Sequence, residues 1–161
     1  MQNFYKNKKI LITGSSGFVG SWLSTALFEM GASLYGISLK PNTSPSLFKL
    51  LNLENKINQK YIDICEFNKL DSAIKEISPD IVFHLAAQPL VRESYERTIE
   101  TFNTNVIGTL NVLEGCKNLG TNVNFVCITT DKCYENNEFG ERFVESDPMG
   151  GKDPYSASKA C

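Results

Sequence analysis

Histidine is almost missing from this chain of 161 residues, which carries only His84, and no two of its cysteines are spaced C-x-x-C. Because zinc sites need clustered thiolates and imidazoles, we expect no metal site. The cysteines are odd in number and scattered, which argues against a disulfide framework and indicates reduced thiols. They are Cys65, Cys116, Cys127, Cys133 and Cys161.

Long runs of basic or of apolar residues are also absent. The net charge is −2, so neither nucleic acid nor an anionic membrane is an expected partner. No stretch approaches the roughly 20 apolar residues of a membrane span, and the first nine residues, MQNFYKNKK, lack the apolar core of a signal peptide. The expected protein is cytoplasmic, with about one domain and a real core.

Short apolar runs alternate with segments of helical spacing. Strands are predicted over residues 10–12, 33–39, 60–64, 80–86 and 123–129, and helices over residues 46–53, 68–77 and 92–119, after residue 20 and from residue 155 onward. The inward side chains are predicted to be Leu47, Leu50 and Leu51 in the first of these helices, and Ile99, Phe102, Val106, Leu110 and Leu113 in the long one. Alternating strands and helices predict an α/β fold, a Rossmann-type doubly wound parallel sheet of order 3-2-1-4-5, with a ligand crevice between strands 1 and 4.

The stretch KILITGSSGFVG places Gly14, Gly17 and Gly20 between a predicted strand and a predicted helix. This is the context that a dinucleotide-binding turn requires. A β-carbon at Gly14 or Gly17 would hold a pyrophosphate away from the backbone, and Gly20 would let the helix lie close to the strand. The helix N-terminus then offers free N–H groups to the anion. An ordinary strand-to-helix turn is the alternative.

Tyr155 and Lys159 lie four residues apart, on one face of a predicted helix. A free phenol has a pKa of about 10 and is a poor base at neutral pH, but an ammonium and a nicotinamide cation favour the phenolate. Such a base can deprotonate a secondary alcohol during hydride transfer. Tyrosine and lysine also pair by chance on many helices, so this motif alone leaves both interpretations open.

A second candidate site follows the last predicted strand, where Thr130, Asp131 and Lys132 stand in a row. Ligands in this architecture bind at the carboxyl edge of the sheet. There a hydroxyl can bond a substrate alcohol, and a carboxylate and an amine can serve as acid and base. A solvated Asp/Lys turn is the alternative.

Further candidates rest on position. Asp63 follows the third strand, where it would accept a hydrogen bond from an adenine amino group or, alternatively, cap a helix. The segment 85–87 would offer small side chains and backbone to a cofactor. Asn105 lies within a helix, where asparagine needs a partner. His84 is expected to be a hydrogen-bonded core residue.

Together these stretches resemble the extended short-chain dehydrogenase/reductase family. The resemblance rests on GSSGFVG, the pair Asp63-Ile64, HLAAQ, TNVIGT and the Tyr155–Lys159 spacing. Within that family, SLKPNTSPSLF, HLAAQPLVRESY, TTDKCYEN and GGKDPYSASKAC are similar to the nucleotide-sugar 4,6-dehydratases that act on CDP-glucose. The matches span nearly the whole chain. The stretch TTDKCYEN is fairly specific to this group, since the relatives that act on dTDP-glucose carry Glu at the position of Lys132.

The resemblance implies tightly held NAD and a redox-neutral cycle on CDP-glucose. Tyr155 would take the C4 hydroxyl proton, while Thr130 and Lys159 position the phenol and the cofactor ribose. Asp131 and Lys132 would assist the loss of water across C5 and C6, and hydride would return to C6. Substrate contacts are implied for Gln88 and Thr130. Cofactor contacts are implied for Gly14, Gly17, Phe18, Val19, Gly20, Lys40, Asp63, Ile64, Leu85, Ala86, Ala87, Asn105, Tyr155 and Lys159.

One departure from the family pattern concerns the cofactor. About 20 residues past the last glycine, the pattern has an acid for the adenosine ribose, and here Lys40 takes that place. A cation suits a 2′-phosphate better. NAD is the expected cofactor, with NADP as the alternative.

The second departure concerns length, because the chain ends at Cys161, whereas family members continue through further strands and a C-terminal nucleotide-sugar domain. We therefore expect residues 1–161 to be an incomplete NAD(P)-binding domain, inactive alone, of an enzyme that is a homo-oligomer at full length. The alternatives are another nucleotide-sugar dehydratase or 4-epimerase, and a non-catalytic dinucleotide-binding module.

Overall fold

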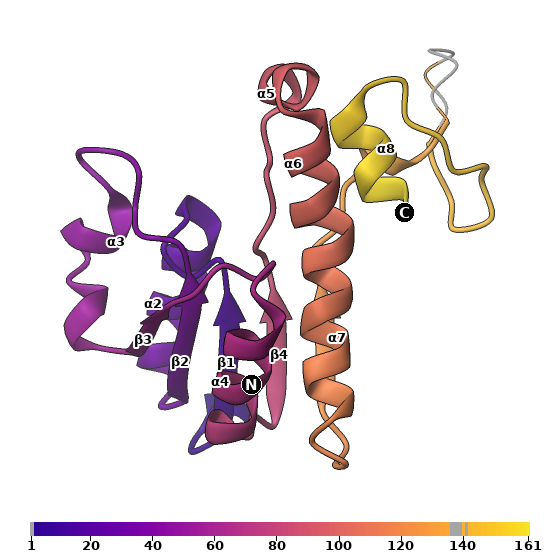
Figure 1. Ribbon diagram of the computed structural model, residues 1–161. Coiled ribbons are helices and arrows are strands. Elements are labelled where there is room, and N and C mark those ends of the chain that lie inside the picture. The colour runs from indigo at the N-terminus through magenta and orange to yellow at the C-terminus, as the bar shows by residue number, and fades with distance from the viewer. Residues whose placement is uncertain (1, 136–139, 141) are drawn as a thin grey trace.

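The computed structural model describes residues 2–135, 140 and 142–161. Within this part, one parallel five-stranded sheet has the order β3-β2-β1-β4-β5, which confirms the predicted order. Strands β3, β2, β1 and β4 lie side by side in Figure 1. The strands are β1 (Lys9–Thr13), β2 (Ser33–Ser38), β3 (Asn58–Tyr61), β4 (Ile81–His84) and β5 (Asn124–Cys127). None of the helices in the described residues combines the length and the hydropathy of a membrane span.

Helices connect successive strands. They are α1 (Gln2–Tyr5), α2 (Phe18–Glu29), α3 (Leu47–Leu50), α4 (Phe67–Ile77), α5 (Val91–Glu96), α6 (Thr98–Phe102), α7 (Thr109–Lys117) and α8 (Pro154–Ala160). Shorter turns are η1 (Leu53–Asn55) and η3 (Asp131–Cys133), and η2 (Asn103–Gly108) is a π-helical segment that joins α6 to α7.

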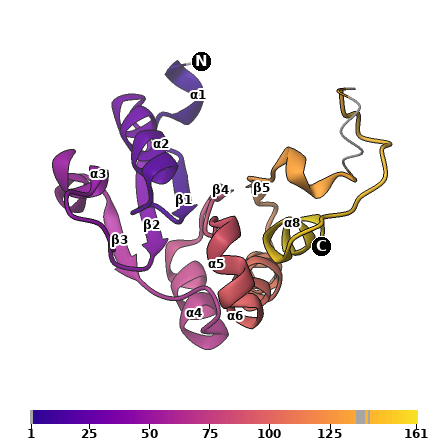
Figure 2. The ribbon, with the colours of Figure 1, turned by 90° about the horizontal axis from the view of Figure 1, so that it is seen from above.

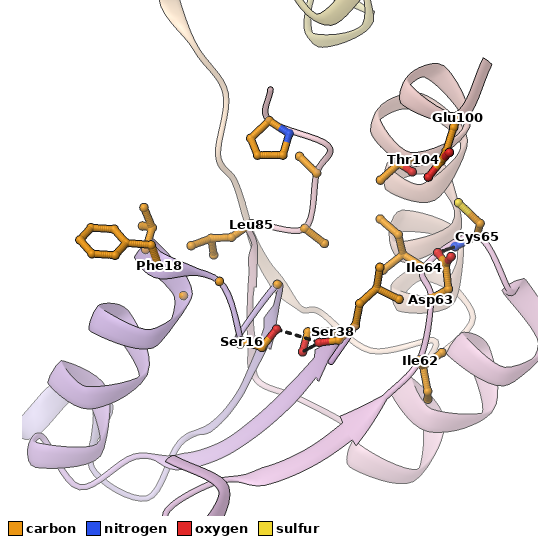
Figure 3. A pocket seen from close by; sticks show the side chains of 18 of the residues that line it. Ser16, Phe18, Ser38, Ile62, Asp63, Ile64, Cys65, Leu85, Glu100 and Thr104 are labelled. Atoms are coloured by element: carbon orange, nitrogen blue, oxygen red, sulfur yellow. Dashed lines mark hydrogen bonds between the residues drawn. The ribbon is translucent and has the colours of Figure 1, made fainter. Parts of the chain in front are cut away.

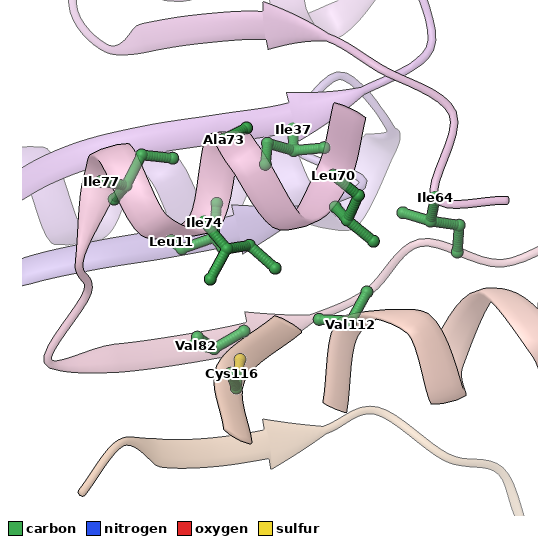
Figure 4. Close-up of a cluster of buried hydrophobic side chains, with 10 residues drawn as sticks. All are labelled: Leu11, Ile37, Ile64, Leu70, Ala73, Ile74, Ile77, Val82, Val112 and Cys116. Carbon is green, nitrogen blue, oxygen red and sulfur yellow. The ribbon is translucent and has the colours of Figure 1, made fainter. Parts of the chain in front are cut away.

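Helices cover both faces of the sheet (Figure 2). Because side chains alternate along each strand, each face carries its own set of buried side chains. On β1, Ile10 and Ile12 pack in the core on the side of α2 and α3, together with Phe48. Leu11 points to the opposite face, where α4 and α7 bury a second apolar cluster (Figure 4). Double coverage explains why β1 and β4 read as nearly continuous apolar runs in the sequence.

The long predicted helix, 92–119, is interrupted at Arg97, between α5 and α6, and three of its five predicted inward side chains are exposed. Ile99 and Leu110, assigned to the core, are 80% and 54% exposed, and Leu113 is also exposed. The buried side chains lie on another face of this helical column. They are Thr101, Asn105, Val112 and Cys116.

Close packing of the helices explains this difference. A β-carbon at Gly115 would lie 2.7 Å from the Cδ1 atom of Ile74 on α4, and one at Gly108 would lie 2.5 Å from the Cδ1 atom of Ile64. The inner face therefore needs small residues, and the large apolar side chains lie on the outer face. A pattern based on apolar spacing alone selects the wrong side.

Two shorter predictions also differ from the structure. The third strand begins at Asn58 and ends at Tyr61, because its partner β2 ends at Ser38; residues 62–64 then leave the sheet. In the predicted helix 46–53, Phe48 is fully buried, whereas Leu50 is 71% exposed.

Candidate functional site

A cleft of about 620 Å³ opens at the carboxyl ends of β1, β2, β3 and β4 (Figure 3). It lies where the strand order reverses between β1 and β4, the usual ligand position in such sheets. Ten of the residues predicted to contact a cofactor line it, namely Gly14, Gly17, Phe18, Val19, Gly20, Asp63, Ile64, Leu85, Ala86 and Ala87.

The conformation of the glycine turn depends on its close contact with the loop that follows β4. Gly14 has φ +73°, and a β-carbon there would lie 2.8 Å from the backbone nitrogen of Ala86. A β-carbon at Gly20 would overlap the carbonyl oxygen of Gly14. Gly14 and Gly20 thus let the turn, the start of α2 and the loop after β4 pack together, a role for Gly14 that sequence analysis did not assign.

Gly17 is the N-cap residue of α2, and no side chain caps this helix end. Phe18, Val19 and Gly20 form the first turn of α2 and line the cleft. The first N–H groups of a helix have no intrahelical partner and attract anions. Among the described residues that line the cleft there is no lysine or arginine, so a diphosphate would be held by backbone N–H groups.

The opposite wall of the cleft is formed by the segment after β3. Ile62 and Ile64 offer apolar surface there, and the Asp63 carboxylate accepts a hydrogen bond from the backbone N–H of Cys65 at 2.9 Å. The N-cap of α4 is Glu66, so Asp63 does not cap that helix. Backbone amides at one end, apolar walls and a carboxylate at the other fit the pyrophosphate and adenine of a dinucleotide.

Residues that sequence analysis missed also line the cleft. Ser16 lies inside the glycine turn, where the motif itself pointed, and its hydroxyl donates to the carbonyl oxygen of Leu39 at 2.8 Å. Glu100 and Thr104 come from α6 and η2. Their place depends on how α6 packs against the sheet, for which the sequence gives no signal.

Lys40 lies beside this cleft rather than in its lining. It borders an adjoining cavity of about 450 Å³ that also touches Ser16 and Gly17. Its Nζ atom lies 5.9 Å from the centroid of the Tyr61 ring, a distance at which a cation is attracted to an aromatic face.

The second group of predicted residues meets at the end of β5, where α8 packs against η3. Lys159 on α8 donates from Nζ to the carbonyl oxygen of Ile128 at 2.9 Å, and burial lowers its pKa. Thr130 caps η3 by accepting a hydrogen bond from the N–H of Lys132 at 3.3 Å. Asp131 and Lys132 are exposed and line a cavity of about 270 Å³ whose other walls include part of α8.

The two groups are neighbours, because β4 and β5 pair side by side with His84 opposite Cys127. The chain after β4 lines the large cleft, and the chain after β5 leads to Thr130. Tyr155, Lys159 and Thr130 are not among the described residues that line the cleft itself. Their predicted contacts with cofactor and substrate stay predictions.

Gln88 and Asn105 form a clamp behind the cleft. The side chain of Asn105 accepts from the N–H of Gln88 at 2.8 Å and donates to its carbonyl oxygen at 3.1 Å. The side-chain amide of Gln88 donates to Leu90 and Thr101. The side-chain oxygen of Gln88 accepts from the N–H of Leu90, so each polar atom of this side chain has a partner within the protein, and its predicted substrate contact stays a prediction.

His84 is buried in a hydrogen-bonded chain, as expected. Its Nδ1 atom lies 2.7 Å from the Thr13 hydroxyl, and its Nε2 atom lies 2.9 Å from the Thr109 hydroxyl. Thr109 donates to the carbonyl oxygen of Asn105, so its oxygen accepts from Nε2–H of a neutral imidazole. Burial, and next the positive charge of Lys159, lower the pKa of His84 to about 4.

This depressed pKa predicts a stability that falls with acid. The unfolded imidazole takes up a proton at a pKa of about 6.5, so the stabilisation is complete above that value and is lost as pH falls toward 4. Between pH 6.5 and 5 the free energy of unfolding should drop by about 2 kcal/mol. Urea unfolding of the wild type and of His84→Asn, which should lose this slope, measures it; an imidazole that titrates near its ordinary value by NMR would contradict it.

Comparison with known proteins gives consistent matches. Residues 11–161 match the family model described as GDP-mannose 4,6 dehydratase. A curated CDP-glucose 4,6-dehydratase from Salmonella typhimurium is 50% identical over 160 residues, covering 99% of this chain and 45% of that protein. The human dTDP-D-glucose 4,6-dehydratase is 34% identical over 157 residues, covering 96% and 44% respectively.

Among solved structures, UDP-glucose 4-epimerase from Thermus thermophilus, in complex with NAD, aligns with a TM-score of 0.79 and 31% identity over 94% of this chain and 47% of that one. The chain thus spans about half the length of the relatives it matches. An epimerase from Methanothermobacter thermautotrophicus aligns with a TM-score of 0.84 and 29% identity over 99% of this chain and 46% of that one.

Proposed function

This chain belongs to the GDP-mannose 4,6 dehydratase family, and from this premise we propose that the full-length enzyme is an NAD-dependent CDP-glucose 4,6-dehydratase. The 50% identity to the Salmonella protein of that name supports the substrate. The observation that carries the chemistry is the docking of α8, through Lys159, at the end of β5 beside Thr130. This docking supports the inference that the Tyr155 phenol, the Lys159 ammonium and the pair Asp131 and Lys132 act together on a substrate bound beside the cofactor.

The first half of the proposed reaction is oxidation at C4 of the sugar. Bound in the cleft, NAD would accept hydride from C4 and return it to C6. Tyr155, as the phenolate, takes the C4 hydroxyl proton. The Thr130 hydroxyl bonds the same sugar oxygen, and Lys159 places a positive charge beside the phenolate oxygen, which stabilises it.

The second half is the loss of water. A ketone at C4 acidifies the proton at C5, so a base can remove it. Lys132 occupies the place of that base, and Asp131 protonates the leaving C6 hydroxyl, which departs as water. When hydride is returned to C6, the proton held by Lys132 goes back to C5. Both side chains lie at the solvent-exposed cavity beside α8, where a sugar can reach them.

NAD is proposed over NADP for two reasons. The related Thermus structure is described with NAD, and Lys40 turns toward the ring of Tyr61. We expect NAD to bind more tightly than NADP in a calorimetric titration, and Lys40→Ala to change either dissociation constant by less than about threefold. Tighter NADP binding that Lys40→Ala weakens would instead assign this lysine to a 2′-phosphate.

The substrate proposal is tested by product analysis. Full-length enzyme with NAD is given CDP-glucose, dTDP-glucose and UDP-glucose in parallel, and the products are identified by mass spectrometry and NMR. Loss of one water from CDP-glucose, faster than from the others, is the expected result, and the 161-residue chain alone should leave CDP-glucose unchanged. A 4-epimerised sugar of unchanged mass would favour the epimerase alternative instead.

The outer face of α6, η2 and α7 supports a homo-oligomer. Ile99, Ile107, Leu110 and Leu113 are all exposed on this helical column, and a contiguous exposed apolar face is typical of an interface. We propose that two copies of the enzyme pair through it, with the helices of each copy packed together. Sedimentation of the full-length enzyme and of a Leu110→Glu variant tests this. The wild type should be a dimer and the variant a monomer, and a dimeric variant would exclude the interface.

A cytoplasmic location is also proposed, and it is tested by cell fractionation.

A further inference from the structure

The position of α8 decides where the proposed catalytic phenol lies, since α8 carries both Tyr155 and Lys159. In the described residues this helix covers Pro154–Ala160. Asp153 caps its first turn by accepting from the N–H of Ser156 at 2.9 Å. Contacts with other elements then fix the position of the helix.

One such contact reaches the backbone N–H of Tyr155. This group belongs to the first turn of α8 and has no partner inside the helix. It donates to the hydroxyl oxygen of Ser94 on α5 at 3.1 Å. Ser94 is fully buried, and its own hydroxyl donates to the carbonyl oxygen of Val91 at 2.6 Å, so that the oxygen is fixed as an acceptor.

A second contact reaches the backbone carbonyl of the same residue. The hydroxyl of Ser158 donates to the carbonyl oxygen of Tyr155 at 2.7 Å. The same hydroxyl accepts from Nδ2 of Asn105 at 2.8 Å. Ser158 and Asn105 are both buried, and each donor in this chain meets one acceptor.

Asn105 also joins this contact to the cofactor cleft. Its side chain pairs with both backbone groups of Gln88, and the residues on either side of Gln88, Ala87 and Pro89, line the cleft. The π-helical segment η2 contains Asn105, and π-bulges occur frequently at functional sites. One asparagine thus touches the cleft-lining loop and the serine that holds Tyr155.

We propose that Ser94, Ser158 and Asn105 are positioning residues that hold both backbone polar groups of Tyr155 and couple them to the loop that lines the cofactor cleft. The proposal rests on the proposed function of Tyr155. It adds a role for Ser94 and Ser158 and gives Asn105 a contact other than the cofactor.

The test uses Ser158→Ala and Asn105→Asp in the full-length enzyme. Asn105→Asp keeps the acceptor for the Gln88 N–H but removes both donors. We expect kcat for CDP-glucose dehydration to fall about 10- to 100-fold, because misplacement of a catalytic group by about 1 Å costs that much, with KM changed less than about threefold. Ser24→Ala is the control, since Ser24 is also buried but has no hydrogen-bond partner among the described residues; its kcat should be unchanged.

A double-mutant cycle separates positioning from a merely structural role. In a Tyr155→Phe background, Ser158→Ala should lower the residual rate much less than in the wild type, because residues that act through one group are not additive. Equal effects in both backgrounds would overturn the proposal. A wild-type enzyme without dehydratase activity would instead refute the proposed function.

A readout independent of activity is amide hydrogen exchange in the full-length enzyme. Ser94→Ala removes the acceptor of the Tyr155 N–H, so exchange at that amide should become at least about 10-fold faster than in Ser24→Ala, by loss of one hydrogen bond. Unchanged exchange at Tyr155 would show that Ser94 does not hold this backbone.

Discussion

Replacing Tyr155 by phenylalanine in the full-length enzyme is expected to lower kcat for CDP-glucose dehydration by about a thousandfold or more. General acid–base catalysis contributes about 10²–10⁴-fold, and the phenol is the group proposed to take the C4 proton. Both backbone contacts of Tyr155 are independent of its hydroxyl, so the fold and the dissociation constant for NAD should stay within about threefold of the wild type. Steady-state kinetics and calorimetry measure the two quantities.

Tyr95→Phe is a matched control, because Tyr95 lies on α5 with its side chain 63% exposed. Removal of that hydroxyl should leave kcat unchanged. If Tyr155→Phe also leaves turnover unchanged, the phenol is not the base and the redox assignment fails. In that case a dinucleotide-binding module with another role becomes the better interpretation of the fold.

Gly14→Ala is expected to damage both the fold and the glycine turn. The backbone of Gly14 is left-handed, with φ +73°, which costs an L-residue about 1–2 kcal/mol. The new β-carbon would also press on the backbone of Leu85 and Ala86, at 2.9 and 2.8 Å, and a backbone cannot rotate away. We expect the free energy of unfolding to fall by about 2–5 kcal/mol in total, and NAD binding to weaken more than tenfold as the turn shifts.

Gly120→Ala separates the cost of the left-handed backbone from the cost of the steric clash. Gly120 has a similar φ of +65°, but a β-carbon there meets nothing within 4 Å. It should cost only about 1–2 kcal/mol and leave NAD binding unchanged. Denaturant unfolding and calorimetry of the two variants measure the difference. Equal losses of stability would mean that the contact with the loop after β4 does not constrain the turn.

Much of this fold follows from local patterns. The strand order could be predicted because β1 and β4 are compact apolar runs and because parallel crossovers allow few topologies. The glycine turn could be predicted because its backbone demands glycine at fixed spacing, and it lies where the motif placed it, between β1 and α2. These features depend on a few consecutive residues, which is why the sequence displays them.

The rest depends on packing between distant segments. The inner face of α7 consists of small residues because Gly115 meets Ile74 closely, and neither residue signals the other in the sequence. Similarly, Glu100 lines the cleft only because the packing of α6 brings it there. Ser94 and Ser158 looked like ordinary helical serines until the structure joined both to Tyr155.

The side of the cleft formed by Ser16, Gly17, Phe18, Val19 and Gly20 has no charged side chain, which has a consequence for how this protein can change over generations. The atoms available to grip a diphosphate are main-chain nitrogens at the start of α2, which every amino acid except proline supplies. Substitutions of the side chains at positions 18 and 19 therefore leave the hydrogen-bond donors for the diphosphate in place. Selection must instead preserve the backbone shape of the turn, which depends on the absence of a β-carbon at Gly14, Gly17 and Gly20.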